Sequence, residues 1–232
     1  MLILSGGKKM IRNINRYIDL SHRPDGNETF EEYLETAKKY NFRCIFGNRF
    51  QYQQAKDYLE GTDIILACGA DFPLGQESIE AQLADFEDLY KVGYREIEGM
   101  LNQYAVEHRL YDYLERQLYE LSLFCNQRGV ASKIIIETCK MDYECLEKIC
   151  KIALKCHPTC LKTSSGRSFM GAELDKVKFM KSILKDEVQI KASGGINTYE
   201  KACAFIEAGC SCVGSSSAVK IVEEERKLFP NG

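Results

Sequence analysis

The sequence predicts an α/β protein, a closed (β/α)8 barrel of the TIM type that forms a single domain. Three observations predict this fold. Short apolar runs alternate with amphipathic helical stretches along all 232 residues, the apolar runs number eight, and no Pro- or Ser-rich linker interrupts them. An open doubly wound sheet is the main alternative. Against it, no G-x-G-x-x-G motif opens a helix after the first strand.

The apolar runs are short and end in polar or small residues, as strands of a parallel sheet do. The predicted strands span residues 16–21, 43–48, 63–70, 95–101, 133–138, 159–165, 188–195 and 211–217.

Segments with helical periodicity separate these strands, for example residues 29–40, 78–93 and 197–209. Residues able to cap a helix amino end stand at Thr29, Asp142 and Thr198. Glycines suited to a left-handed carboxyl cap stand at Gly93, Gly129 and Gly209. The longest insertion, residues 103–128, lies between the fourth and fifth strands and predicts a helical stretch rather than another domain.

The composition is that of an ordinary cytoplasmic protein, 45% hydrophobic and 28% charged. A net charge of −3 provides no basic field for nucleic acid or an anionic membrane. No apolar run approaches the roughly 18 residues that cross a bilayer. We expect one domain over residues 1–232, of which about 1–12 form an N-terminal extension.

Eleven cysteines do not form a recognisable pattern of disulfides or metal ligands. Their number is odd, no C-x-x-C occurs, and the three histidines lack zinc-site spacing. Most cysteines take the place of small buried apolar residues. We therefore expect reduced thiols, no metal and no cofactor.

Lysines occur on three successive predicted strands. Lys133, Lys162 and Lys191 are spaced 29 residues apart, about one βα unit each. Alternation places Lys162 on the face of Cys160, and Lys191 on the face of Ser193. A single strand-end lysine often extends its ammonium group to solvent. Two on adjacent strands, each followed by small hydroxyl residues, instead predict a functional pair inside the barrel.

Two ammonium groups in a low-dielectric interior repel each other, so one of them should lose its proton. A neutral lysine amine attacks carbonyls and forms a Schiff base. Asp19, Glu96 and Glu98 are carboxylates that could balance the lysine charges and relay protons. Of the two glutamates, Glu98 is the better candidate for a functional role, and Glu96 for an ordinary ion-pair partner.

The last two strands end in glycine and serine, at Gly194–Gly195 and Gly214–Ser217. Freed backbone amides, hydroxyl groups and a helix amino end form an anion cradle, a frequent arrangement after strands seven and eight of such barrels. Arg167 would add a charge-assisted contact. The pattern predicts a phosphorylated substrate.

These motifs resemble the deoxyribose-phosphate aldolase family. The resemblance rests on "LKTSSG", "IKASGGINT", "GSSSAV", "KIIIET" and "FPLGQ", in the family's order, and covers nearly the whole chain. It implies a class I aldolase that reversibly cleaves 2-deoxy-D-ribose 5-phosphate to acetaldehyde and D-glyceraldehyde 3-phosphate without metal.

Carried over by residue, the resemblance makes Lys162 the Schiff-base lysine and Lys191 the lysine that perturbs its pKa. Lys133, at the start of its predicted strand, is a further lysine near the site, and Asp19 belongs to the polar end of the first strand. Phosphate-binding positions are matched by Gly195, Ser216 and Ser217, with Gly194 and Arg167 as helpers.

The chain departs from the family pattern at several positions. Glu98 replaces the proton-relay aspartate, and Gly99, where a larger apolar residue is usual, is expected to make room for it. Asp71 stands where glycine is common. The segments 21–26 and 166–173 also differ from the family pattern. These departures leave the identity of the substrate less defined than the class of reaction.

Two alternatives remain open: a Schiff-base aldolase for a different phosphorylated or sulfonated sugar, and a non-catalytic barrel that binds a phosphometabolite. Residues 104–124 are either a contact surface for a homodimer or simply a cover for the barrel. The expected partner is a small phosphosugar, not nucleic acid or a membrane.

Overall fold

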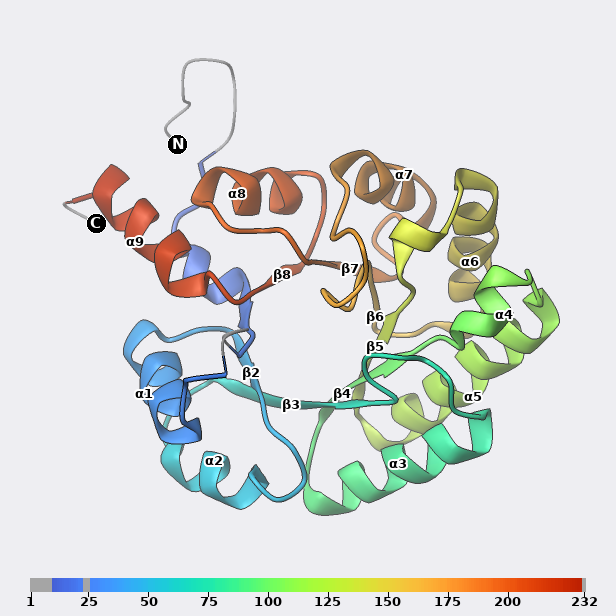
Figure 1. Ribbon diagram of the computed structural model, residues 1–232, viewed down its shortest axis with the longest axis horizontal. Helices are drawn as coiled ribbons and strands as arrows, with labels where there is room; N and C mark the ends of the chain where they lie inside the picture. Colours follow the sequence, from blue (N-terminus) through green and yellow to red (C-terminus); the bar gives the residue numbers. More distant parts are fainter. Residues whose placement is uncertain (1–9, 23–25, 231–232) are drawn as a thin grey trace.

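The structure is a computed structural model that describes residues 10–22 and 26–230. Within those residues eight parallel strands close into a barrel in chain order, with the first paired to the eighth. The predicted (β/α)8 barrel is therefore confirmed, and Figure 1 shows its helices surrounding the ring of strands. The strands are β1 (Ile18–Leu20), β2 (Cys44–Phe46), β3 (Ile65–Ala70), β4 (Glu96–Met100), β5 (Ala131–Ile135), β6 (Cys160–Lys162), β7 (Gln189–Ser193) and β8 (Cys212–Ser215).

Helices follow the strands and cover the outside of the barrel (Figure 1). The α-helices are α1 (Phe30–Tyr40), α2 (Tyr52–Tyr58), α3 (Ile79–Val92), α4 (Gln103–Glu107), α5 (Tyr111–Arg128), α6 (Tyr143–Cys156), α7 (Leu174–Leu184), α8 (Tyr199–Glu207) and α9 (Ala218–Leu228). Two short 3₁₀ helices are η1 (Ile14–Tyr17) and η2 (Thr138–Lys140).

The predicted amino caps are confirmed, since the side chains of Thr29, Asp142 and Thr198 each accept a hydrogen bond from a backbone N–H of their helix. Gly93 and Gly129 cap the carboxyl ends of α3 and α5. α8 differs by one residue, because its cap is Ala208 and Gly209 follows with φ +105°. These helix boundaries were thus encoded locally.

The strands begin one or two residues from their predicted starts, and β1, β3 and β5 differ by two. Residues 16 and 17 belong to η1, so β1 starts at Ile18. β5 starts at Ala131, two residues early, because the Ala131 N–H donates to the Arg95 carbonyl and extends the ladder with β4. The prediction that Lys133 opens its strand was therefore wrong: Lys133 lies in the middle of β5, inside the barrel.

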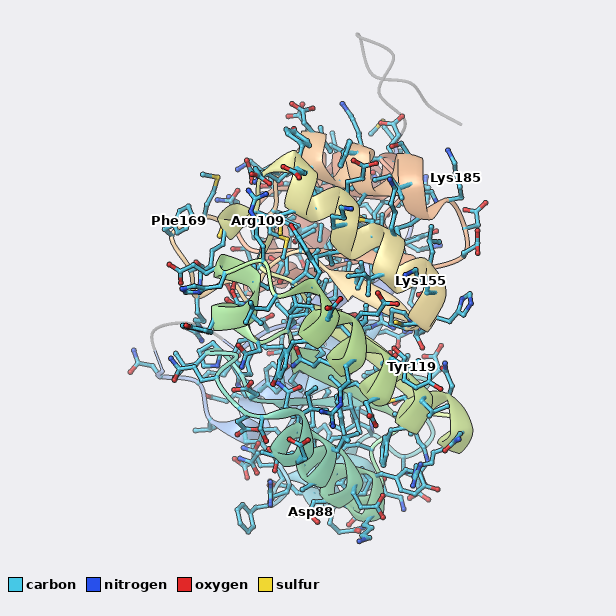
Figure 2. The ribbon with its side chains drawn as sticks, turned by 90° about the vertical axis from the view of Figure 1, so that its right-hand side faces the viewer. Asp88, Arg109, Tyr119, Lys155, Phe169 and Lys185 are labelled. Atoms are coloured by element: carbon cyan, nitrogen blue, oxygen red, sulfur yellow. The ribbon has the colours of Figure 1, made fainter. Side chains whose placement is uncertain are left out.

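The 103–128 insertion is helical as predicted, but it consists of α4 and α5 with a break at Arg109, whose φ is +54°. Leu114, Leu118 and Leu121 bury one face of α5 against the barrel. Figure 2 shows Tyr119 of α5 and Lys155 of α6 on the outer surface. α5 therefore covers the barrel and also presents an exposed aromatic residue.

The predicted N-terminal extension is described only from residue 10 onward, and residues 1–9 lie outside the described residues. The carbonyl of Ile11 accepts a hydrogen bond from the Tyr199 hydroxyl at 2.6 Å, and Arg12 stacks on the Phe229 ring. Residues 11 and 12 thus pack against α8 and the end of α9. Among the described residues, no helix combines the length and the hydropathy needed to span a membrane.

Side chains alternate along each strand, so one set packs in the layer between strands and helices and the other set faces the barrel axis. Outward-facing residues such as Ile97, Ile134, Leu161 and Ile190 are fully buried in the apolar layer between strands and helices. Their sequence neighbours face the barrel axis, and several of these are charged. This arrangement gathers the charges of different strands in one place.

Candidate active site

Glu98 of β4 joins the two lysines that the sequence paired. Lys162 and Lys191 are directly opposite each other on β6 and β7. Lys162 Nζ lies 2.6 Å from Glu98 Oε2, and Lys191 Nζ lies 2.7 Å from Glu98 Oε1. All three side chains are buried, with exposed fractions of 5% or less. The structure therefore brings these three predicted residues together.

A second carboxylate lies on the other side of Lys191. Asp19 Oδ2 of β1 is 2.6 Å from Lys191 Nζ and 2.9 Å from Lys133 Nζ. Lys133 Nζ is also 2.5 Å from Glu96 Oε1. Asp19 and Lys133, both predicted site residues, thus connect to Lys162 through Lys191 and Glu98.

Arg43, immediately before β2, completes this chain of contacts and was missed by the sequence analysis. Its Nε is 2.5 Å from Asp19 Oδ1, and its Nη2 is 2.9 Å from Glu96 Oε1. Glu96 is therefore an ion-pair partner. The available signal for Arg43 was the same as for the lysines: a cation between Phe42 and Cys44 at the start of an apolar strand.

The two paired lysines have opposite pKa shifts. Burial lowers the pKa of Lys162; Glu98 counteracts this, but Lys191 lowers it further, and the net shift is downward. Burial also acts to lower the pKa of Lys191, yet Asp19 and Glu98 outweigh it and raise that pKa. Of the two, Lys162 is thus the amine that loses its proton more readily, whereas Lys191 favours the ammonium form.

The carboxylates remain ionised. Burial alone would raise the pKa of Glu98, but Lys162 and Lys191 lower it to about 2. For Asp19, Lys191, Lys133 and Arg43 together overcome burial and hold the pKa far below its usual value. Each carboxylate can therefore accept hydrogen bonds from the lysines across the neutral pH range.

Three side chains with metal-ligand atoms, Asp19, Cys44 and Glu96, meet inside the barrel. Burial raises the pKa of the Cys44 thiol well above its usual value, so it is a poor metal ligand. The two carboxylates already pair with Lys133 and Arg43. The oxygens of both carboxylates therefore already face ammonium or guanidinium groups.

A cavity of about 820 Å³ opens above Lys162 at the carboxyl ends of the strands. Lys162 and Glu98 line it, whereas the more deeply buried Lys191 does not. The rings of Phe46 and Phe72 have their centroids 5.9 and 5.7 Å from Lys162 Nζ. A small carbonyl compound in this cavity would reach one buried amine between two aromatic walls.

The predicted phosphate cradle lines the same cavity. Gly194 and Gly195 adopt φ values of +84° and +74°, which side chains rarely adopt. A Cβ atom on Gly194 would lie 2.8 Å from Gly171 Cα, so the loops after β6 and β7 touch through their backbones. Ser216 and Ser217 also line the cavity, immediately before α9.

Arg167 follows β6 at the rim of the cavity, and its side chain is exposed. Glu137, whose part in the site the sequence analysis missed, fixes this turn. Its buried carboxylate accepts hydrogen bonds from the Ser165 N–H and hydroxyl, and the Ser165 hydroxyl accepts one from the Arg167 N–H. Phe169, two residues on, is 74% exposed and projects outward in Figure 2.

Gly99 does not make room for Glu98, so that prediction was wrong. Alternation turns position 99 to the opposite face, where a Cβ atom would lie 2.9 Å from Phe86 Cζ in α3. Asp71, another departure, has φ +53°, and its carboxylate accepts hydrogen bonds from Gln76 N–H and the Gln82 side chain. Residues 23–25 of the divergent 21–26 segment lie outside the described residues.

The chain is similar to enzymes of one kind in several organisms. It is 36% identical to a deoxyribose-phosphate aldolase of Lactobacillus acidophilus over 189 residues, 82% of this chain and 80% of that protein. It is 34% identical to a deoxyribose-phosphate aldolase of Thermococcus kodakarensis over 216 residues, 91% of this chain and 96% of that protein. No protein-family model matches the chain.

Solved structures agree with the fold. An aldolase named QR15 superposes with a TM-score of 0.82 at 27% identity and covers 94% of this chain and 99% of its own. A deoxyribose phosphate aldolase of Aeropyrum pernix, described as a unique tetramer, superposes with a TM-score of 0.80 at 24% identity, over 93% of this chain and 92% of its own. From its identity to the curated relatives over most of its length, the chain belongs to the deoxyribose-phosphate aldolase family.

Proposed function

We propose that this protein is a class I aldolase that reversibly cleaves 2-deoxy-D-ribose 5-phosphate to acetaldehyde and D-glyceraldehyde 3-phosphate. The observation that carries the proposal is the Lys162 amine. It lies in the floor of the cavity, its pKa is lowered, and the glycine–serine cradle lines the same cavity. Membership of the deoxyribose-phosphate aldolase family supports the choice of substrate.

In the cleavage direction, the neutral Lys162 amine attacks C1 of the open-chain sugar, and loss of water with uptake of one proton gives a protonated imine. The C3 hydroxyl then gives up its proton and the C2–C3 bond breaks. The bond's electron pair moves into an enamine on the lysine, and C3 leaves as the aldehyde carbon of glyceraldehyde 3-phosphate. Protonation of C2 and addition of water release acetaldehyde and restore the amine.

Glu98 is the group we assign to proton transfer in these steps, directly or through a water molecule, with Lys191 as its charged partner. Asp19 contacts Lys191 directly, and Lys133 contacts Asp19, so we assign both residues to holding Lys191 in place. None of these steps needs a metal, and we propose that the reaction proceeds without one.

The substrate phosphate would lie in the cradle formed by Gly194, Gly195, Ser216 and Ser217, with Arg167 at the rim. The backbone amides of a glycine-rich turn and the amino end of α9 favour an anion. Binding the phosphate at β7 and β8 fixes the far end of the sugar, so that its aldehyde carbon can meet Lys162.

The test is to trap the imine. Incubation with acetaldehyde followed by borohydride reduction should increase the protein mass by one ethyl group. Lys162→Ala should abolish the increase, whereas Lys155→Ala, on the outer surface of α6, should leave it intact. Failure to gain mass, or a gain that survives Lys162→Ala, would contradict the proposal.

A second candidate keeps the chemistry and changes the substrate to another phosphorylated or sulfonated sugar. Glu98 and the exposed Phe169–Met170 loop favour it, because both differ from the family pattern beside or near the cavity. Turnover on a panel of phosphosugars separates the two. A non-catalytic phosphometabolite binder would bind such sugars but give no trapped imine.

We further propose that the protein works in the cytoplasm on this small-molecule substrate. A homodimer through α4 and α5 also stays a proposal, with Tyr104 and Tyr119 as exposed aromatic residues of that face. Sedimentation of the wild type beside Tyr119→Lys would test the contact.

A further inference from the structure

The charges inside the barrel do not balance. The barrel charge network comprises the cations Arg43, Lys133, Lys162 and Lys191 and the carboxylates Asp19, Glu96 and Glu98. Four basic groups thus face three acids in this network. If every group were ionised, one positive charge would be left without a buried counter-charge, which is costly in a low-dielectric interior.

Arg43 is the member that cannot remove this excess by losing a proton. A guanidinium group stays charged in proteins, whereas a lysine readily shifts its pKa when buried. Arg43 precedes β2, so it enters the network from the end of the barrel opposite the cavity, and its side chain is 18% exposed. The proton must therefore leave one of the three lysines.

The contacts decide which lysine it is. Lys133 has two carboxylate partners, Asp19 and Glu96, and Lys191 has Asp19 and Glu98. Lys162 has Glu98 alone and shares it with Lys191. Arg43 also pairs with Asp19 and Glu96. Lys162 is therefore the amine whose positive charge has the least negative charge beside it.

We propose that Arg43 is a positioning residue for the imine chemistry: it supplies the one fixed positive charge that exceeds the buried carboxylates and so keeps Lys162 uncharged. The inference rests on the proposed function, since it assigns a cause to the reactivity of the Schiff-base amine. Without Arg43 three lysines would face three carboxylates, and all of them could remain protonated.

The other ionisable groups near the network do not restore the balance. Burial raises the pKa of the thiols of Cys44, Cys160 and Cys212, which keeps them neutral. His22 and Arg167 line the rim of the cavity, and both are basic, so neither offers the missing negative charge. Glu137 is a buried carboxylate near the cavity, but it accepts hydrogen bonds from Ser165 and pairs with no cation of the network. The excess therefore falls on the lysines.

The experiment measures the pH midpoint of acetaldehyde trapping, from about pH 5 to about pH 10, by the mass gained on borohydride reduction. Arg43→Met should raise the midpoint by roughly half a unit or more, because removing a positive charge favours protonation of Lys162. Arg43→Lys should keep it near the wild-type value. Arg16→Met is the matched control, since Arg16 pairs with the exposed Asp63 outside the network.

If Arg43 acts through charge balance, two further results are expected that a purely structural role of Arg43 does not predict. Glu96→Gln increases the excess charge and should lower the midpoint. The double variant Arg43→Met/Glu96→Gln again has one cation more than it has carboxylates, and its midpoint should return toward that of the wild type. Far-ultraviolet circular dichroism of each variant confirms that it is folded.

The outcomes separate this inference from the proposed function. A wild-type protein without a trappable imine would overturn the proposed function and this inference with it. A normal wild-type imine whose midpoint is unmoved by Arg43→Met overturns the inference alone. Should Arg43→Met not fold, Glu96→Gln alone still decides, because an unchanged midpoint in that variant is equally incompatible with the inference.

Discussion

Lys162 and Lys191 are opposite each other on neighbouring strands, and their ammonium nitrogens share the single carboxylate of Glu98. One carboxylate cannot neutralise two ammonium groups in a buried site. The conflict is resolved because Lys191 has Asp19 as a second partner and Lys162 does not. The two opposite positions therefore differ in charge compensation, and the pKa of Lys162 is lowered while that of Lys191 is raised.

Lys191→Met should weaken imine formation without removing the nucleophile. The substitution removes a neighbouring positive charge and leaves Glu98 to Lys162 alone, so both effects raise the pKa of Lys162. A higher pKa leaves less free amine at neutral pH. Trapping at pH 7 should fall by about tenfold or more and recover as the pH rises through the new pKa, since one pKa unit changes the neutral fraction tenfold.

The measurement is the initial rate of acetaldehyde trapping against pH, with Lys176→Met as a control on a lysine outside the barrel interior. The wild-type rate should rise at a pH below the usual range of lysine. A Lys191→Met profile that coincides with the wild type would show that burial alone sets the pKa of Lys162.

Glu98→Gln should separate proton transfer from imine formation. The amide keeps the size of the side chain but cannot accept and return a proton, so exchange of the acetaldehyde methyl hydrogens with solvent should slow by about 10²- to 10⁴-fold. Trapping should persist, because losing a negative charge lowers the pKa of Lys162 further. Exchange is followed by nuclear magnetic resonance in deuterated water.

Glu98→Asp, which restores the residue usual in the family, is the matched variant with a carboxylate one methylene shorter. It should retain more of the exchange than Glu98→Gln does. If Glu98→Gln exchanges at the wild-type rate, the proton relay belongs to Lys191 or Asp19 instead.

Arg167→Ala should weaken phosphate recognition only. A hydrogen bond to a charged group contributes about 1.5–3 kcal/mol, so KM for a phosphorylated sugar should rise about 10- to 100-fold. Acetaldehyde has no phosphate, and its trapping on Lys162 should be unaffected. Arg109→Ala is the control, because Arg109 pairs with Asp142 and Glu144 on the outside of the barrel. Equal losses with both substrates would mean that the loop, not the charge, was damaged.

The sequence was most informative where one feature recurred from strand to strand. The alternation of eight apolar runs with helical stretches predicted the barrel, and the 29-residue spacing of Lys133, Lys162 and Lys191 predicted the lysine pair. Arg43 was missed because its partners, Asp19 and Glu96, lie 24 and 53 positions away and meet it only when the barrel closes. Contacts of that kind depend on strand register, which a strand pattern does not specify.

At β4 the prediction that Gly99 makes room for Glu98 was wrong for a different reason. Glu98 and Gly99 are neighbours in sequence, but consecutive residues of a strand face opposite sides, so the small residue relieves packing against α3 rather than beside Glu98. The position of Lys133 was misjudged because Ala131 and Ser132 gave no apolar signal, although the ladder to β4 includes them.

Gly99→Ala tests this account of β4. The new methyl group would lie 2.9 Å from Phe86 Cζ and 3.3 Å from Phe86 Cε2, too close for the buried ring to remain in place. Overpacking of this kind costs about 1–3 kcal/mol, and the free energy of unfolding, measured by urea denaturation, should fall by that amount. Phe86→Leu in the same chain should recover part of it. Gly69→Ala, whose Cβ would meet its nearest neighbour at 3.5 Å, is the control and should change stability little.

Trapping by folded Gly99→Ala should match the wild type, because the methyl group points away from Glu98. Reduced trapping in folded protein, together with unchanged stability, would mean that position 99 does adjust the Glu98 carboxylate.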